Sequence, residues 1–131
     1  MAKEFPNAGQ PQPQNKRSPD FESLYSNNFA FESSVWDFKI IFGELDQTLG
    51  VIEQHTAMTL PWSGVKLLIY YLETNVAAQE IVNGEIKIPR SVVPAEPPPI
   101  PEEHKNNPVF QKVYEKFREL HKEFLASLPP A

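Results

Sequence analysis

The chain has 131 residues, 14 of them proline, and a formal net charge of −5 at pH 7. Its length allows one modest domain with flanking segments. It contains no cysteine, so neither a disulfide nor a thiolate metal ligand can form. The excess of acidic residues argues against nucleic acid as a partner, because binding phosphate groups requires clustered Lys and Arg.

The prolines separate a foldable centre from its flanks, since 13 of the 14 lie outside residues 21–88. The N-terminus has no apolar signal region, and the longest apolar run, LLIYYL, is far shorter than a membrane span. We therefore expect a cytoplasmic protein without membrane association. The predicted organisation is a disordered arm at residues 1–20, a small α+β domain at 21–93, a proline-rich linker at 94–107 and an amphipathic helix at 108–128.

Two segments that alternate apolar and polar residues predict the first two strands. Tyr25, Phe29 and Phe31 fall on one side of the first strand. In the second strand, Gly43 allows a bulge or a close backbone approach. The apolar inner face of this second strand is predicted to consist of Trp36, Phe38, Ile40 and Phe42.

A turn at residues 46–50, DQTLG, leads into a third predicted strand at residues 51–60. The alternation of this strand is blurred, because Ile52 falls on the same side as Met58 and Leu60 while other apolar residues fall opposite. Both faces of the strand are therefore expected to be partly covered.

After the third strand the apolar spacing changes to that of a helix, predicted over residues 61–82. Pro61 suits the first helical turn, and Asn83-Gly84 supplies a left-handed C-terminal cap. Residues 85–89 form a short extended segment. The apolar surface of the helix is wider than one stripe, so a second helix or subunit is expected against it. The predicted oligomer interface includes Leu67, Tyr70 and Tyr71.

These elements predict an α+β fold. Its core is a three- or four-stranded antiparallel meander with the long helix packed across one face, followed by a tethered C-terminal amphipathic helix. A unit of this size is marginally stable alone and has no disulfide to support it. Open strand edges and the wide apolar helix surface therefore predict a homo-oligomer, a dimer or higher.

The C-terminal region gives the strongest functional lead. The stretch EPPPIP predicts a semi-rigid spacer, and Asn107 with Pro108 predicts the start of a helix. The helix could dock in cis on its own core or in trans on another subunit or another protein. Its predicted partner-binding seam, with residues spaced alternately by three and four, consists of Phe110, Val113, Phe117, Leu120 and Phe124.

The titratable side chains do not have the spacing of a catalytic or metal site. His55 and Glu53 share one side of the third predicted strand and could begin an acid–base site, but a solvent-facing or partner-facing pair is the simpler interpretation. Asp37, Glu44 and Asp46 fit a polar strand face and turn chemistry. We predict no enzymatic activity, no cofactor and no bound metal.

A second hypothesis is a single-stranded nucleic-acid-binding domain that stacks bases on an aromatic sheet face. Core packing explains the same residues more simply, because they alternate as a buried face does and no basic groove accompanies them. The stacking residues would be Tyr25, Phe29, Phe31, Trp36 and Phe38.

Three blocks of the core occur in a fixed order. They are Tyr25 to Asn28, SVWDFKIIFG from Ser34 to Gly43, and GEIKIP from Gly84 to Pro89, with a strand and a helix from Trp62 before the last. In this arrangement the core resembles a small bacterial family of uncharacterised domains with a Ser-x-Trp-Asp-Phe-x-x-x-Phe-Gly motif. The resemblance covers about half of the chain and implies no catalytic residues.

Composition and pattern together predict a non-enzymatic, oligomeric interaction or assembly protein. Its core would self-associate, and its C-terminal helix would dock on a partner or on a neighbouring subunit.

Overall fold

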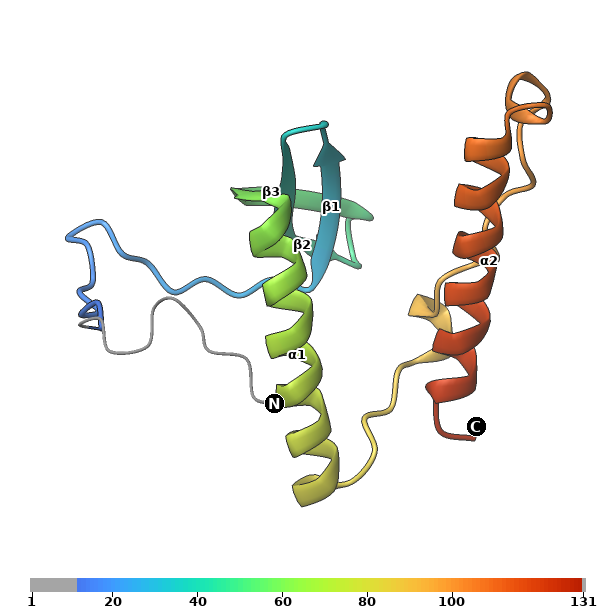
Figure 1. Cartoon of the computed structure of the whole chain (residues 1–131). Helices are drawn as coiled ribbons and strands as arrows, with labels where there is room; N and C mark the ends of the chain where they lie inside the picture. The colour runs from blue at the N-terminus through green and yellow to red at the C-terminus, as the bar shows by residue number, and fades with distance from the viewer. Residues whose placement is uncertain (1–11, 131) are drawn as a thin grey trace, which may run out of the picture. The chain divides into compact units, whose positions relative to one another are not determined.

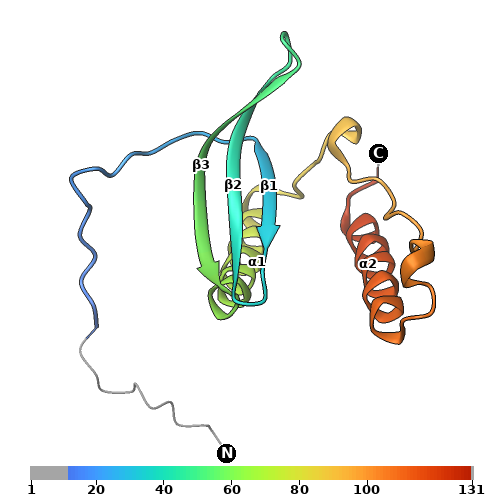
Figure 2. The same cartoon turned by 90° about the horizontal axis from the view of Figure 1, so that it is seen from above.

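The computed structural model describes residues 12–130 and confirms the predicted α+β class (Figures 1 and 2). A three-stranded antiparallel sheet in the order β1-β2-β3 is followed by one long helix and a C-terminal helix. The first 11 residues of the predicted N-terminal arm lie outside the described part of the chain. The chain divides into two compact units, with the boundary between Trp62 and Ser63.

The strands belong to the first unit, and both long helices belong to the second apart from the first residue of α1. The strands are β1 (Asn28–Ser33), β2 (Asp37–Asp46) and β3 (Val51–Pro61). The helices are α1 (Trp62–Asn83), the short 3₁₀ helices η1 (Arg90–Val92) and η2 (Glu102–His104), and α2 (Pro108–Ser127).

Cross-strand pairing gathers the large apolar residues of the sheet on one face. Phe29 lies opposite Phe42 on β2, and Phe31 lies opposite Ile40. Paired residues of antiparallel strands point to the same side, so each pair adds to one surface. We call this surface the apolar sheet face; it consists of Phe29, Phe31, Phe38, Ile40, Phe42, Met58 and Leu60.

A β-bulge explains the blurred alternation of the third strand. Phe42 pairs with Thr56, but the next residue of β2, Gly43, pairs with Gln54, so His55 is an extra residue in β3. A bulge of this kind shifts the alternation of the strand by one residue. The expectation that Ile52 shares a side with Met58 is therefore wrong, because the bulge lies between them.

Gly43 permits the close strand approach that the bulge requires, as the sequence predicted. It is buried, and a Cβ atom built on it would lie 2.9 Å from the carbonyl oxygen of Glu53. The backbone on both sides is tied to the segment before β1. The carbonyl of Gly43 accepts hydrogen bonds from the amide of Asn27 (3.1 Å) and the hydroxyl of Ser26 (2.9 Å), while the Asn27 side chain accepts from the amide of Leu45 (2.8 Å).

Three residues lie outside the elements that the sequence assigned to them. Tyr25 precedes β1, which begins only at Asn28, and Pro61 ends β3 instead of starting α1. Trp36 lies in the β1–β2 turn and is 83% exposed. This turn is stabilised by the Ser34 hydroxyl oxygen, which accepts from the amides of residues 36 and 37 at 3.1 and 3.0 Å. Side-chain bonding of this type ends a strand, which alternation alone does not reveal.

Local chemistry sets the helix ends much as predicted. α1 ends at Asn83, and the next residue, Gly84, has a left-handed φ of 93° and donates its amide to the carbonyl of Glu80 at 3.0 Å. α2 begins after Asn107, whose side chain accepts from the amides of Val109 and Phe110 at 3.0 and 3.4 Å. No strand forms after α1, so the sheet has three strands within residues 12–130. No helix in this range is long and apolar enough to cross a bilayer.

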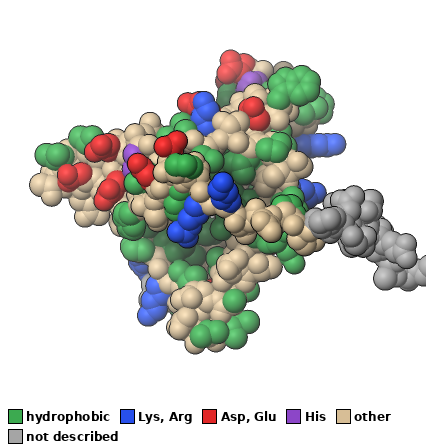
Figure 3. All heavy atoms as spheres, turned by 90° about the vertical axis from the view of Figure 1, so that its left-hand side faces the viewer, with side chains coloured by type: hydrophobic (Ala, Val, Ile, Leu, Met, Phe, Trp, Pro, Cys, Tyr) green, Lys and Arg blue, Asp and Glu red, His purple; other side chains and the backbone are tan. Residues whose placement is uncertain are grey.

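Hydrophobic side chains are incompletely covered throughout the described chain. Between residues 12 and 130 no hydrophobic side chain is fully buried. On the face drawn in Figure 3, hydrophobic side chains lie at the molecular surface among the charged side chains. α1 has no buried residue, so the expected packing of this helix across the sheet stays a prediction. Large apolar surfaces without cover are typical of chains that bind a partner.

Candidate functional site

The predicted partner-binding residues of α2 lie in one stripe along the helix, the α2 seam, and four of the five are exposed. Phe117 and Leu120 are 48% and 49% exposed, while Phe110 and Val113 are 39% and 37% exposed. Phe124, near the C-terminal end, is half-buried. Residues spaced by three and four lie on one side of a helix, so these five side chains share one face.

The proline-rich segment packs alongside α2 in the opposite chain direction (Figures 1 and 2). Near the start of the helix, the His104 ring stacks on Phe110, with ring centroids 4.1 Å apart and planes 10° apart. Near its end, Nε2 of His121 lies 3.0 Å from the carbonyl oxygen of Pro94 and donates to it. The segment therefore returns along the helix. The spacer interpretation had expected it to extend away from the helix.

The segment covers the face of α2 beside the seam and contacts the seam itself at Phe110, through His104. Tyr114, His121 and Leu128 are half-buried and are seven residues apart, so they share one line along the helix. The ring centroid of Tyr114 lies 6.4 Å from that of His104. Seam residues such as Phe117 lie on the adjacent line. The linker thus determines which face of α2 is the more exposed one.

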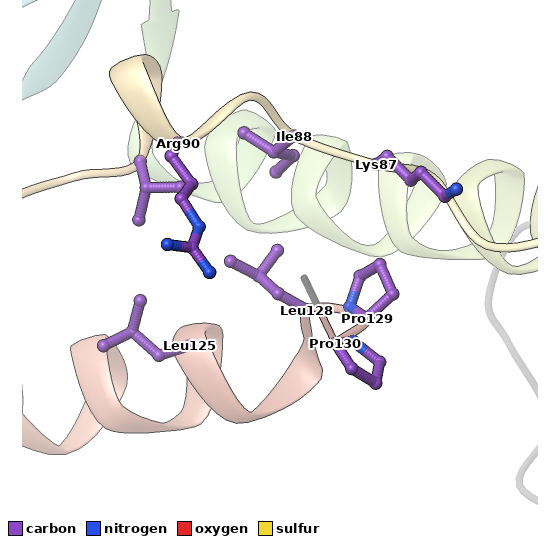
Figure 4. A pocket seen from close by; sticks show the side chains of 8 residues that line it. Lys87, Ile88, Arg90, Leu125, Leu128, Pro129 and Pro130 are labelled. Carbon is purple, nitrogen blue, oxygen red and sulfur yellow. The ribbon is translucent and has the colours of Figure 1, made fainter.

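A hollow of about 660 Å³ lies between the segment that follows α1, residues 87–93, and the C-terminal end of α2 (Figure 4). Its lining is aliphatic except for the cationic side chains of Lys87 and Arg90. No salt bridge joins either cation to an acid among residues 12–130. The other lining residues are Ile88, Val93, Leu125, Leu128, Pro129 and Pro130.

The predicted oligomer-interface residues of α1 are also exposed. Leu67, Tyr70 and Tyr71 are 57%, 59% and 57% exposed, and the two tyrosine rings meet edge to face at 5.4 Å. The three charged residues of α1 follow one another at intervals of seven and share one line along the helix. They are Lys66, Glu73 and Glu80. A helix with so narrow a charged stripe has a wide apolar surface to cover.

The apolar sheet face brings together some of the aromatic residues considered for base stacking. Phe31 stacks on Phe38 at 5.4 Å, and Trp62 joins that cluster with its ring 5.2 Å from Phe38. Tyr25 and Trp36 lie outside the strands. The residues paired on this face include no lysine or arginine. Its surface is aromatic and aliphatic, without the cations that would bind phosphate.

His55 is the extra residue of the bulge, and both nitrogens of its ring make hydrogen bonds. Its Nε2 lies 2.9 Å from the carbonyl oxygen of Tyr25, and its Nδ1 lies 2.8 Å from the hydroxyl of Thr56. A carbonyl oxygen only accepts, so Nε2 carries the proton in this bond and Nδ1 can accept from the hydroxyl. Because both ring nitrogens have partners, His55 ties β3 to the segment before β1.

The carboxylates weighed as catalytic candidates take part in turns and strand pairing. Asp37 accepts from the Ser34 hydroxyl at 3.0 Å, and Oδ1 of Asp46 accepts from the amides of the next turn at 2.9 and 3.2 Å. Glu44 lies directly opposite Glu53 across β2 and β3. In the described part of the chain, no three His, Asp or Glu side chains are placed to hold a metal ion.

Two features of the structure were not predicted from the sequence: the hydrogen bonds at the bulge and the position of the linker on α2. The hydrogen bonds of Ser26 and Asn27 to the bulge could have been anticipated only from the polar run SNN before a strand, because such residues often bond nearby backbone. The linker position on α2 had no comparable signal, since proline-rich composition predicts an extended segment without naming the surface it contacts.

No protein-family model, no curated protein and no solved structure matches the chain. The resemblance to the small bacterial domain family therefore stays a prediction.

Proposed function

We propose that this chain is a non-enzymatic assembly protein. Its sheet and α1 self-associate through their exposed apolar surfaces, and the α2 seam docks on a neighbouring subunit or a protein partner. The single observation that supports this most is the seam, because its first four residues are 37–49% exposed although the linker already covers the adjacent face.

The lack of full burial supports the same proposal. A small domain stabilises itself mainly by removing apolar surface from water. Since no hydrophobic side chain of residues 12–130 is fully buried, much of that stabilisation is left for further contacts, and self-association is one way to supply them. The nucleic-acid hypothesis has less support, because the aromatic sheet face lacks cations and ends near the opposed carboxylates Glu44 and Glu53.

Phe117→Asp tests the proposal. The ring exposes 48% of its surface, which is about 100 Å² for a phenylalanine. Covering that area contributes about 2.5 kcal/mol at ~25 cal/mol per Å². We therefore expect docking to weaken by roughly 50-fold or more, with an added loss from bringing a carboxylate into the interface.

The measurement is native mass by light scattering, together with affinity capture from lysate, on the full chain. Ala126→Asp is the matched control, because it adds the same charge to an exposed position of α2 away from the seam. Circular dichroism checks that both variants keep their helix content. Unchanged mass and unchanged partners in Phe117→Asp would reject the proposal.

A further inference from the structure

We infer that the occupant of the α2 seam is the α2 helix of a second copy of this chain, paired antiparallel. The inference deepens the proposed function and rests on it, since it names the partner and the geometry of the docking step. Its physical basis is the charge pattern on the exposed flank of the seam.

The two flanks of the seam differ in chemistry and in exposure. One flank, with Tyr114 and His121, is half-buried and lies against the linker. The other, which we call the open flank, consists of Val109, Lys116 and Glu123, which are exposed and seven residues apart. Residues in such positions beside an apolar seam determine which helix pairs with which, and in which direction.

The charges of the open flank match those of a second copy only in the antiparallel direction. Lys116 lies in the N-terminal half of the flank and Glu123 in the C-terminal half. Between antiparallel helices, identical flanks meet with reversed order. Lys116 of each copy therefore meets Glu123 of the other, and the two contacts are equivalent by symmetry.

Parallel pairing gives the open flank no matching charge. In a parallel pair the open flank of one helix meets the flank of Tyr114 and His121 of the other, which has no acidic residue. Lys116 would then have no acidic partner on the second helix. Within its own helix, Lys116 contacts only the exposed Glu119, at 3.3 Å, so it can exchange that partner at little cost.

The sizes of the seam residues are also compatible with antiparallel pairing. With the charges matched, each large aromatic residue lies opposite a smaller one of the second copy. The resulting layers are Phe110 with Ser127, Val113 with Phe124, and Phe117 with Leu120, each formed twice. Three heptads form a weak pair alone, and self-association of the rest of the chain raises the effective concentration of the helices.

Charge exchange between full-length chains tests the inference. Lys116→Glu alone and Glu123→Lys alone should each weaken α2-dependent association by about tenfold, because two attractions become two repulsions. Mixing the two variants should restore it, since both contacts are then between opposite charges. Lys122→Glu, on the outer face of α2, makes the same charge change and should have no effect. Sedimentation equilibrium at low ionic strength measures each case.

A second measurement uses the absence of cysteine from the chain. A short bismaleimide should join a Lys116→Cys chain to a Glu123→Cys chain faster than it joins either chain to itself. Equal association of the charge variants and the original chain, or no preference in the crosslinking, would overturn antiparallel self-pairing. If Phe117→Asp still abolishes docking in that case, the proposed function stands with another partner. If Phe117→Asp also has no effect, both proposals fail.

Discussion

Replacing Gly43 by alanine should destabilise the sheet through a direct clash at the bulge. The new Cβ would lie 2.9 Å from the carbonyl oxygen of Glu53, 3.1 Å from Cγ2 of Ile52 and 3.3 Å from Cα of Gln54. Two of these neighbours are backbone atoms of β3, so the strands must separate by a few tenths of an ångström. We expect a loss of about 1–3 kcal/mol in the free energy of unfolding. That is a large fraction of the ~5–15 kcal/mol that stabilises a typical domain.

Substitutions at Gly50 are the control that separates the steric clash at Gly43 from backbone strain. Gly50 has a left-handed φ of +64°, and no atom lies within 4 Å of the place that a Cβ would occupy, so Gly50→Ala costs only backbone strain of about 1 kcal/mol. Asparagine tolerates that conformation, and Gly50→Asn should cost less than Gly50→Ala. At Gly43 the order should reverse, because asparagine is larger.

Urea unfolding at one fixed protein concentration measures these differences, since association shifts apparent stability. Of the two tryptophans, Trp62 reports on the sheet by its fluorescence, because its ring lies 5.2 Å from that of Phe38, while Trp36 is already 83% exposed in the folded chain. The reasoning fails if Gly43→Ala is as stable as the original chain within about 0.5 kcal/mol. It also fails if asparagine is the milder substitution at Gly43.

Two further predictions concern α2 and its linker. Asn107→Ala removes the side-chain cap of the helix and should cost about 1 kcal/mol, seen as lower helix content and earlier thermal unfolding, whereas Asn106→Ala should change neither. His121→Ala removes the donor to the Pro94 carbonyl and should raise amide hydrogen exchange in residues 95–105 about fivefold. Unchanged exchange there would show that this bond does not hold the linker on the helix.

Features that depend on neighbours along the chain were predicted well. The helix α2 follows from its alternating spacing, and its start follows from Asn107 and Pro108, which the structure places at the helix cap and first position. The left-handed end of α1 at Gly84 follows in the same way. Each depends on chemistry within a few residues, so the pattern contains the information.

Features that depend on contacts between distant segments were predicted poorly. Trp36 is a local exception among the errors: it belongs to an apolar alternation, yet it lies in a turn in which Ser34 bonds the backbone amides two and three residues on. Ile52 changed face because the bulge at His55 depends on the register between β2 and β3. A register shift leaves no trace in the period of a single strand, since it is defined only by the partner strand.

The sequence by itself therefore determined the α+β class, the order of strands and helices, and the start of α2. Local propensity, capping and periodicity are properties of short stretches of chain. Only the tertiary structure decided that the proline-rich segment returns along α2 and covers the flank of Tyr114 and His121. That choice leaves Lys116 and Glu123 beside the open seam. It depends on stacking and hydrogen bonds between residues up to 27 positions apart, which no local pattern specifies.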